Sequence, residues 1–260
     1  MQETNFIISL TTLPPRFKHL KMVLDSLCGQ AYDNYEVHLN VPKETKFDGE
    51  YKEDLSKYDY GDRLKIFYVE DVGAVTKLYY TLKRTKNAEQ RIITVDDDFI
   101  YDKYMLSEYN LYIQENPKIS EGVIGFAGVY PLHKSGPTDG TLDCIGALKE
   151  PQRVGITEGY KSVCYKRSHF SKDFFENGYK YHYNDDLAVF AWLGLNGVEK
   201  WCIPYRFESS YQNRVLSFPL VHELTYPKSG INHQRDDEGG SQVSYKKFYN
   251  TEIGKGIQVW

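Results

Sequence analysis

The first hundred residues alternate between strand-like and helix-like hydrophobic patterns. Four short runs rich in apolar side chains have the length of strands: residues 6–10, 35–41, 64–69 and 91–95. Residues 17–27 and about 74–84 instead space their apolar side chains three or four positions apart, which predicts amphipathic helices. Pro14 and Pro15 suit the first turn of the earlier helix, and Gly29 ends it. Strands joined through helices indicate right-handed crossovers and a mainly parallel sheet.

The pattern is less regular in the rest of the chain. Five further elements are predicted there: strands at residues 123–130, 162–166 and 200–203, and helices at residues 170–175 and 185–195. Between residues 133 and 159, glycine and proline recur without periodicity, which predicts a long loop region. Residues 43–62 are polar and are expected to form a surface excursion. Residues 229–241 are polar and glycine-rich, which predicts a flexible tail or a lid.

Composition narrows the class of protein. The 260 residues are 41% apolar and 26% charged, which is typical of a soluble globular protein with one sizeable core or two closely fused halves. A net charge of −4 argues against nucleic acid as a partner. No run approaches the roughly 18 apolar residues of a membrane span, and no signal peptide is recognisable. We therefore expect a cytoplasmic protein that contacts a membrane, if at all, only peripherally. The four cysteines are widely spaced and predict neither a zinc site nor a disulfide framework.

An acidic triplet, Asp96-Asp97-Asp98, directly follows the apolar strand at residues 92–95. Three adjacent carboxylates repel one another unless a cation or hydrogen-bond donors compensate them. Their hard oxygen ligands favour Mg²⁺, Mn²⁺ or Ca²⁺ over Zn²⁺. In open sheets of this kind, ligands bind beyond the carboxyl ends of the strands, where the triplet lies. Side-chain alternation predicts that Asp96 and Asp98 point to one side and Asp97 to the other. The alternative interpretation is an acidic turn or a helix N-terminus.

Other charged residues fall at predicted helix starts. Lys77 follows Gly73 near the start of the helix at 74–84, where an ammonium group and the helix N-terminus together suit a diphosphate. Arg16 either pairs with a phosphate or lies on a helix surface. Asp185 and Asp186 open the helix at 185–195, where an acidic residue either caps the helix or acts chemically.

Several segments together resemble the GT-A glycosyltransferases, and family 2 among them. They are Ile7-Ile8-Ser9-Leu10-Thr11-Thr12 with Arg16, Ser26-Leu27-Cys28-Gly29-Gln30, Tyr35-Glu36-Val37, Gly73-Ala74-Val75-Thr76-Lys77-Leu78 and Val95-Asp96-Asp97-Asp98-Phe99-Ile100-Tyr101. The resemblance covers roughly residues 5 to 203. It implies one GT-A domain over residues 1–260, an α/β fold with a Rossmann-like half and a mixed central sheet. Residues 1–101 would bind the nucleotide-sugar and residues 102–228 the acceptor, with 229–260 as the tail or lid.

The resemblance also implies a chemistry. The enzyme would be a hexosyltransferase that uses a nucleoside diphosphate sugar, UDP- or GDP-linked, together with Mn²⁺ or Mg²⁺, and acts on a glycan or glycoconjugate acceptor. The loop from Thr11 to Arg16 would hold the base and ribose. Asp98 would bind the metal, with Asp96 near the ribose or on the metal and Asp97 beside the donor; the division of roles among the three stays open.

The resemblance assigns two further roles, both in the second half of the chain. Inverting GT-A enzymes carry an acidic pair that opens a helix in the acceptor half, and its second carboxylate is the general base. Asp186 takes that position here, with Asp185 as the alternative. Some members use a C-terminal histidine as an additional metal ligand, a role open to His233.

Two other functions compete with this prediction. A nucleotidyltransferase that acts on sugar phosphates binds nucleotides on a similar sheet, but such enzymes carry a glycine-rich basic loop after the first strand. Residues 11–16 contain no glycine. A non-catalytic carbohydrate-binding module would use the abundant aromatics, 23 Tyr, 13 Phe and 3 Trp, to stack on sugars. Tyr160 is one candidate for such stacking, in an enzyme or in a module.

Overall fold

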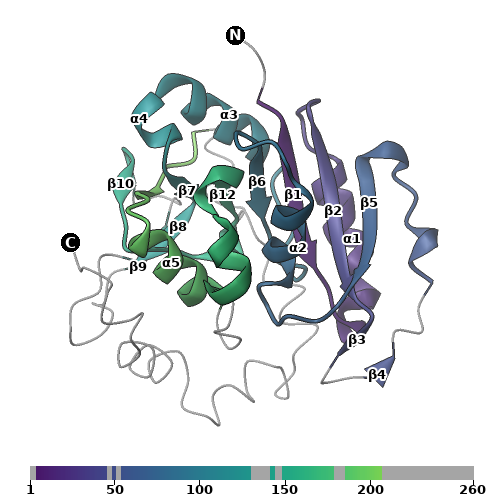
Figure 1. Cartoon of the computed structure of the whole chain (residues 1–260). Coiled ribbons are helices and arrows are strands. Elements are labelled where there is room, and N and C mark those ends of the chain that lie inside the picture. The colour runs from purple at the N-terminus through teal and green to yellow at the C-terminus, as the bar shows by residue number, and fades with distance from the viewer. Residues whose placement is uncertain are drawn as a thin grey trace.

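A computed structural model describes residues 4–45, 49–50, 54–129, 141–143, 148–178 and 185–206. Its centre is an eight-stranded sheet (Figure 1). The strands, in the order in which they lie side by side, are β10 (Gln152–Arg153), β13 (Lys200–Cys202), β7 (Val123–Gly125), β12 (Val163–Lys166), β6 (Arg91–Thr94), β1 (Phe6–Thr11), β2 (Tyr35–Pro42) and β5 (Leu64–Val69). The predicted tail, and His233 with it, lies outside the described residues.

The direction of the strands changes across this sheet. The four strands predicted in the first hundred residues are parallel, with β1 between β2 and β6 and with β5 beside β2. β12 then runs antiparallel to both β6 and β7, and β10 runs antiparallel to β13. The sheet is therefore mixed, and its parallel half places the carboxyl ends of β1 and β6 at one edge.

Helices cover both faces of the sheet (Figure 1). They are α1 (Phe17–Cys28), α2 (Thr76–Arg84), α3 (Met105–Glu115), α4 (Pro117–Ser120) and α5 (Asp185–Leu195). Side chains of α1 and α3 share one hydrophobic cluster with Ile8 and Ile93, whereas α2 and α5 share another with Ile7 and Ile92. Because neighbouring strand residues face opposite sides, these two clusters are the two faces of the sheet. No described helix is long and apolar enough to cross a membrane.

One predicted strand is in fact two. The prediction of a single strand at residues 123–130 was wrong, because the chain leaves the main sheet after β7. Its continuation, β8 (Ala127–Val129), belongs to a three-stranded sheet with β9 (Thr141–Asp143) and β11 (Ile156–Thr157). Phe126, between the two strands, is fully buried with its ring 4.5 Å from that of Tyr109. Burial of this ring accompanies the change of sheet.

The remaining elements are short. Residues 170–175 were predicted as a helix. In the structure a 3-10 turn, η5 (Arg167–His169), comes first, and residues 172 and 173 are helical and continue into a π-helical turn, η6 (Phe174–Gly178). Around the predicted excursion at 43–62 lie β3 (Glu44–Thr45), β4 (Gly49–Glu50), η2 (Leu55–Lys57) and η3 (Gly61–Arg63). Two further 3-10 turns, η1 (Pro14–Arg16) and η4 (Gly159–Lys161), flank the carboxyl edge of the parallel strands. The described part of the predicted loop at 133–159 contains β9, β10, β11 and the start of η4.

Candidate functional site

The acidic triplet lies in a turn just beyond β6. The strand ends at Thr94, and the backbone N–H of Val95 still donates to the carbonyl of Ser9 in β1, at 3.1 Å. Asp97 and Asp98 then occupy a turn. Because strand geometry stops before the triplet, side-chain alternation does not extend into it. In this turn, Asp97 and Asp98 share one partner, and Asp96 has another.

Arg16 is the shared partner of Asp97 and Asp98. It is the last residue of η1, the turn that follows β1 with Pro14 at its first position. Its guanidinium pairs with Asp97 through Nη1 and with Asp98 through Nη2, the latter 3.1 Å from Oδ2. The arginine side chain is 17% exposed, whereas those of Asp97 and Asp98 are 3% and 7% exposed. One cation therefore faces two nearly buried carboxylates, which leaves an excess of negative charge.

This excess charge makes the triplet suitable for a cation. No described side chain or backbone group pairs with Oδ2 of Asp97 or Oδ1 of Asp98, although both atoms are buried. Burial, together with the charges of Asp96 and Asp97, raises the pKa of Asp98 to about 7 against the opposing effect of Arg16. Unpaired carboxylate oxygens are the donors that Mg²⁺ and Mn²⁺ prefer. Among the described residues, no group of three or more His, Cys, Asp and Glu side chains is arranged to hold a metal by itself.

Lys77 is the partner of Asp96. It lies in the first turn of α2, its side chain is 9% exposed, and its Nζ is 2.6 Å from Oδ1 of Asp96. Its backbone carbonyl accepts hydrogen bonds from Ser9 Oγ and from Asn40 Nδ2, side chains of β1 and β2. These buried contacts fix the start of α2 against the sheet. Lys77 is therefore an anchored, buried cation and not a solvated residue of a helix surface.

Asp186 approaches the same place from the second half of the chain. It lies in the first turn of α5, is half-buried, and its Oδ2 accepts a hydrogen bond of 3.2 Å from the backbone N–H of Gly159. A methyl group placed on Gly159 would lie 2.9 Å from Oδ1 of Asp186 and 3.2 Å from Nζ of Lys77. Both side chains thus border the same point in front of Gly159. Asp185 begins α5, but its side chain lies outside the described residues.

Tyr101 joins the acidic turn to η4. Its hydroxyl accepts a hydrogen bond from the backbone N–H of Asp96 at 2.8 Å and donates one to the carbonyl of Tyr160 at 3.2 Å. The ring of Tyr160 lies 5.7 Å from that of Phe99, centre to centre. In the sequence, Tyr101 belongs to a motif of the family resemblance but has no predicted role, and Gly159 was not predicted as a site residue. The roles of Tyr101 and Gly159 become visible only in the folded chain, where segments that are distant in the sequence meet.

Thr11 reaches the same edge of the sheet at the end of β1. Its hydroxyl donates to the backbone carbonyl of Asn40 at 2.8 Å, so its proton is already used within the protein. The structure therefore brings together Arg16, Lys77, the acidic triplet and Asp186, with Thr11 at the same edge of the sheet. His233 lies outside the described residues.

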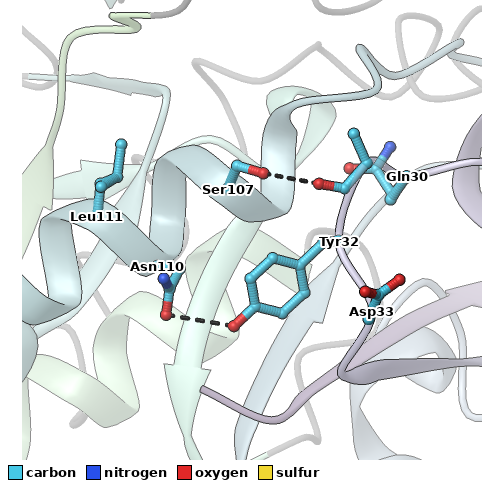
Figure 2. Close-up of a pocket in the computed structure, with 7 residues that line it drawn as sticks. Gln30, Tyr32, Asp33, Ser107, Asn110 and Leu111 are labelled. Atoms are coloured by element: carbon cyan, nitrogen blue, oxygen red, sulfur yellow. Dashed lines mark hydrogen bonds between the residues drawn. The ribbon is translucent and has the colours of Figure 1, made fainter. Parts of the chain in front are cut away.

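A separate pocket lies elsewhere on the molecule, with a volume of about 410 Å³ (Figure 2). Residues 30–33, from the loop between α1 and β2, and Ser107, Asn110 and Leu111 of α3 line it. Polar groups of its lining bond to one another: Ser107 Oγ donates to the carbonyl of Ala31 at 3.0 Å, and Tyr32 Oη donates to Asn110 Oδ1 at 3.2 Å. It contains none of the residues to which the sequence assigned a role in binding or catalysis, although Gln30 belongs to one of the segments that carry the family resemblance.

Comparison with known proteins places the fold. No protein-family model matches the sequence, and no protein of curated function matches it either. Among solved structures, S. aureus TarS 1–349 in complex with UDP-GlcNAc is 14% identical, with a TM-score of 0.50 over 97% of this chain and 69% of that one. The mannosyltransferase PcManGT from Pyrobaculum calidifontis, in complex with GDP-Man and Mn²⁺, is 12% identical, with a TM-score of 0.53 over 96% of this chain and 66% of that one. The predicted fold is confirmed: the chain has the GT-A glycosyltransferase fold.

Proposed function

We propose that this chain is a metal-dependent hexosyltransferase that moves a sugar from a nucleoside diphosphate sugar to a hydroxyl of a glycan or glycoconjugate, with inversion at the anomeric carbon. The observation that supports this proposal is the meeting of two acidic groups from separate halves of the chain. The turn at Asp96–Asp98 and the helix start at Asp186 approach one another around Lys77 and Gly159. We assign donor binding to residues 1–101 and acceptor binding to residues 102–228.

The donor half carries the groups that a diphosphate needs. Arg16 and Lys77 supply two positive charges at one edge of the sheet, each held by carboxylates of the triplet. On donor binding, these cations would bind phosphate oxygens through charge-assisted hydrogen bonds. Asp98, with Asp97 beside it, would hold Mn²⁺ or Mg²⁺, which when bound would stabilise the negative charge that develops on the leaving diphosphate. Two buried carboxylate oxygens without a protein partner support this assignment.

The acceptor half supplies the base. Gly159 donates its N–H to Oδ2 of Asp186, and Oδ1 lies beside the point that Lys77 also borders. In the transfer, an acceptor hydroxyl attacks the anomeric carbon, its proton passes to the Asp186 carboxylate, and the bond from that carbon to the diphosphate oxygen breaks. The electron pair of the broken bond leaves with the diphosphate. Attack opposite the leaving group inverts the configuration. A base of this kind must approach the hydroxyl to within roughly 3 Å.

UDP- and GDP-sugars are the donors to test first, because the two similar structures were solved with UDP-GlcNAc and with GDP-Man. The experiment is a panel of UDP-, GDP-, CMP- and dTDP-sugars, with saccharide acceptors and with water, each in Mn²⁺ and in EDTA. We expect release of the nucleoside diphosphate from one class of donor, dependent on the metal. Release of pyrophosphate from a nucleoside triphosphate and a sugar phosphate would instead identify a nucleotidyltransferase. Glycan binding with no turnover of any donor would identify a carbohydrate-binding module.

A further inference from the structure

We infer that Gly159 is a positioning residue of the transfer site: its missing side chain leaves the space in which Asp186 and Lys77 approach one another. This inference rests on the proposed function. A Cβ atom on Gly159 would lie 2.9 Å from Oδ1 and 3.7 Å from Cγ of Asp186, and 3.2 Å from Nζ of Lys77. The two shortest distances are below the roughly 3.5–4.0 Å at which nonbonded atoms attract. The three nearest atoms all belong to the two side chains to which the reaction is assigned.

Backbone conformation does not explain this glycine. The described glycines with positive φ are Gly61, Gly73 and Gly197, and Gly159 is not among them. An alanine can therefore adopt the backbone conformation of residue 159 without strain. A larger residue is excluded by the side chains of Asp186 and Lys77, which lie in front of position 159. Because the nearest atoms are the ends of two side chains and not backbone, the fold can accommodate a methyl group at little cost, whereas the geometry of the site cannot.

The turn that carries Gly159 is held from several directions. The N–H of Glu158 donates to the carbonyl of Ala127 at 3.0 Å, and the carbonyl of Gly159 accepts from the N–H of Ser162 at 3.0 Å. The carbonyl of Tyr160 accepts the Tyr101 hydroxyl, which also holds the backbone of Asp96. The turn could make room for a methyl group on Gly159 only by moving, and such a movement would disturb the acidic triplet. Asp186, which has the shortest contact, would move instead.

Displacement of Asp186 has a specific consequence. Its Oδ2 would lose the alignment given by the N–H of Gly159, and its Oδ1 would be pushed away from the point bordered by Lys77. Lys77 keeps its short contact to Asp96 and its backbone anchors, so donor binding is disturbed less. A misplacement of a catalytic group by about 1 Å costs on the order of 100-fold in rate. The loss should therefore appear in kcat and much less in the KM for the donor.

The test is Gly159→Ala, with Gly122→Ala as the matched control. A Cβ on Gly122 would lie 2.7 Å from the backbone carbonyl oxygen of Glu199, and this glycine lies just before the amino end of β7. Gly122→Ala should lower Tm and leave kcat unchanged. Gly159→Ala should leave Tm unchanged, lower kcat by about 10- to 100-fold, and change the donor KM by less than about 3-fold. Wild-type kcat in folded Gly159→Ala, or a loss fully explained by a lower Tm, would overturn the inference.

A double-mutant cycle with Asp186→Asn decides whether Gly159 acts through Asp186. If it does, Gly159→Ala should lower the residual kcat of Asp186→Asn by less than about 3-fold, because residues that act together are not additive. If Gly159→Ala lowers the kcat of Asp186→Asn by the same factor as it lowers the kcat of wild type, the inference is overturned. Wild-type protein in the same assays separates this inference from the proposed function. If the wild type transfers no sugar from any donor, the proposed function fails; if it does and Gly159→Ala matches it, only the inference fails.

Discussion

Lys77 and Asp96 form a nearly buried ion pair, with 2.6 Å between Nζ and Oδ1 and exposures of 9% and 27% for the two side chains. The pair joins α2 to the turn after β6, and Asp186 borders the same point in front of Gly159 as the ammonium group. An ammonium group placed among carboxylates from both halves of the chain is well located to bind a diphosphate. Lys77 is therefore the residue through which donor binding is most directly tested.

We expect Lys77→Gln to weaken donor binding. Loss of a charge-assisted hydrogen bond to phosphate costs about 1.5–3 kcal/mol, which corresponds to a rise in the donor KM of roughly 10- to 100-fold. The matched control is Lys83→Gln, because Lys83 is on the same helix and exposed. Steady-state kinetics over a range of donor concentrations gives both values. A donor KM that is equal in Lys77→Gln and Lys83→Gln would remove Lys77 from the donor site.

Arg16→Gln tests the balance of charge in the triplet. Removal of this guanidinium leaves Asp97 and Asp98 buried without their cation, which we expect to lower the stability of the metal-free protein by about 2–4 kcal/mol. A lowering of Tm by about 5–10 °C follows for a chain of this size. Mn²⁺ should raise Tm more in Arg16→Gln than in wild type, since it replaces the lost charge.

The control for Arg16 is Arg153→Gln. Arg153 pairs with Glu199 at the surface, at 3.2 Å, and both side chains are substantially exposed. Such a pair contributes about 0–1 kcal/mol, so Tm should move by no more than about 4 °C. Differential scanning fluorimetry in EDTA and in Mn²⁺ makes the comparison. If Arg16→Gln unfolds at the wild-type temperature in EDTA, the triplet does not depend on Arg16.

Asp98 should make the metal-free protein less stable as pH rises toward neutrality. Burial raises the pKa of Asp98 to about 7, above its ordinary value in the unfolded chain, so the folded state holds a proton that the unfolded state has released. Between about pH 4 and pH 7 this group therefore lowers the free energy of unfolding as pH increases, by up to about 4 kcal/mol. Above its folded pKa, the contribution no longer changes with pH.

Asp98→Asn isolates this contribution. Burial lowers the pKa of His38 and of His169 to about 4, which acts in the opposite direction, but both histidines remain in the variant and cancel in the difference. Urea unfolding in EDTA from pH 5 to pH 8 should give a wild-type stability that falls relative to Asp98→Asn. Parallel curves for the two proteins would show that Asp98 is not held protonated by its surroundings.

Asp186→Asn should lower kcat without affecting donor binding. The amide keeps the shape of the side chain but cannot accept the proton, and a general base contributes about 10²- to 10⁴-fold. Asp185→Asn is the matched comparison on the same helix, and we expect it to keep most of its activity. If kcat is retained in Asp186→Asn and is strongly lowered in Asp185→Asn, the general base is Asp185 and not Asp186.

The sequence predicted the parallel half of the sheet because its elements repeat clear periods. Alternation in the sequence of β2 and helical spacing in α1 and α2 are local properties, and they reveal the type of each element, although both faces of β2 are buried. The triplet at the carboxyl end of β6 was predictable for the same reason. The strand predicted at 123–130 was wrong because the change of sheet at Phe126 depends on packing against α3, a helix that the hydrophobic pattern did not predict.

The contacts within the site were less predictable. The partner of each carboxylate depends on where β6 ends. Because the strand stops at Thr94, alternation does not extend into the triplet, and Asp97 and Asp98 share Arg16. Gly159 gave no local signal, since its importance comes from Asp186 and Lys77, which are distant in the sequence. Long-range approach of this kind is set by the packing of α5 and α2 on the same face of the sheet, not by any motif.

The central claim is that the acidic triplet binds a divalent cation together with a nucleoside diphosphate. Titration of Mn²⁺ followed by electron paramagnetic resonance, with UDP and then GDP present, measures this directly in wild type and in Asp98→Asn. We predict one bound Mn²⁺ in wild type, with an affinity raised by one of the two nucleotides, and an affinity at least about 10-fold lower in Asp98→Asn. Equal Mn²⁺ binding by the two proteins, or no binding by wild type with either nucleotide, would contradict the account.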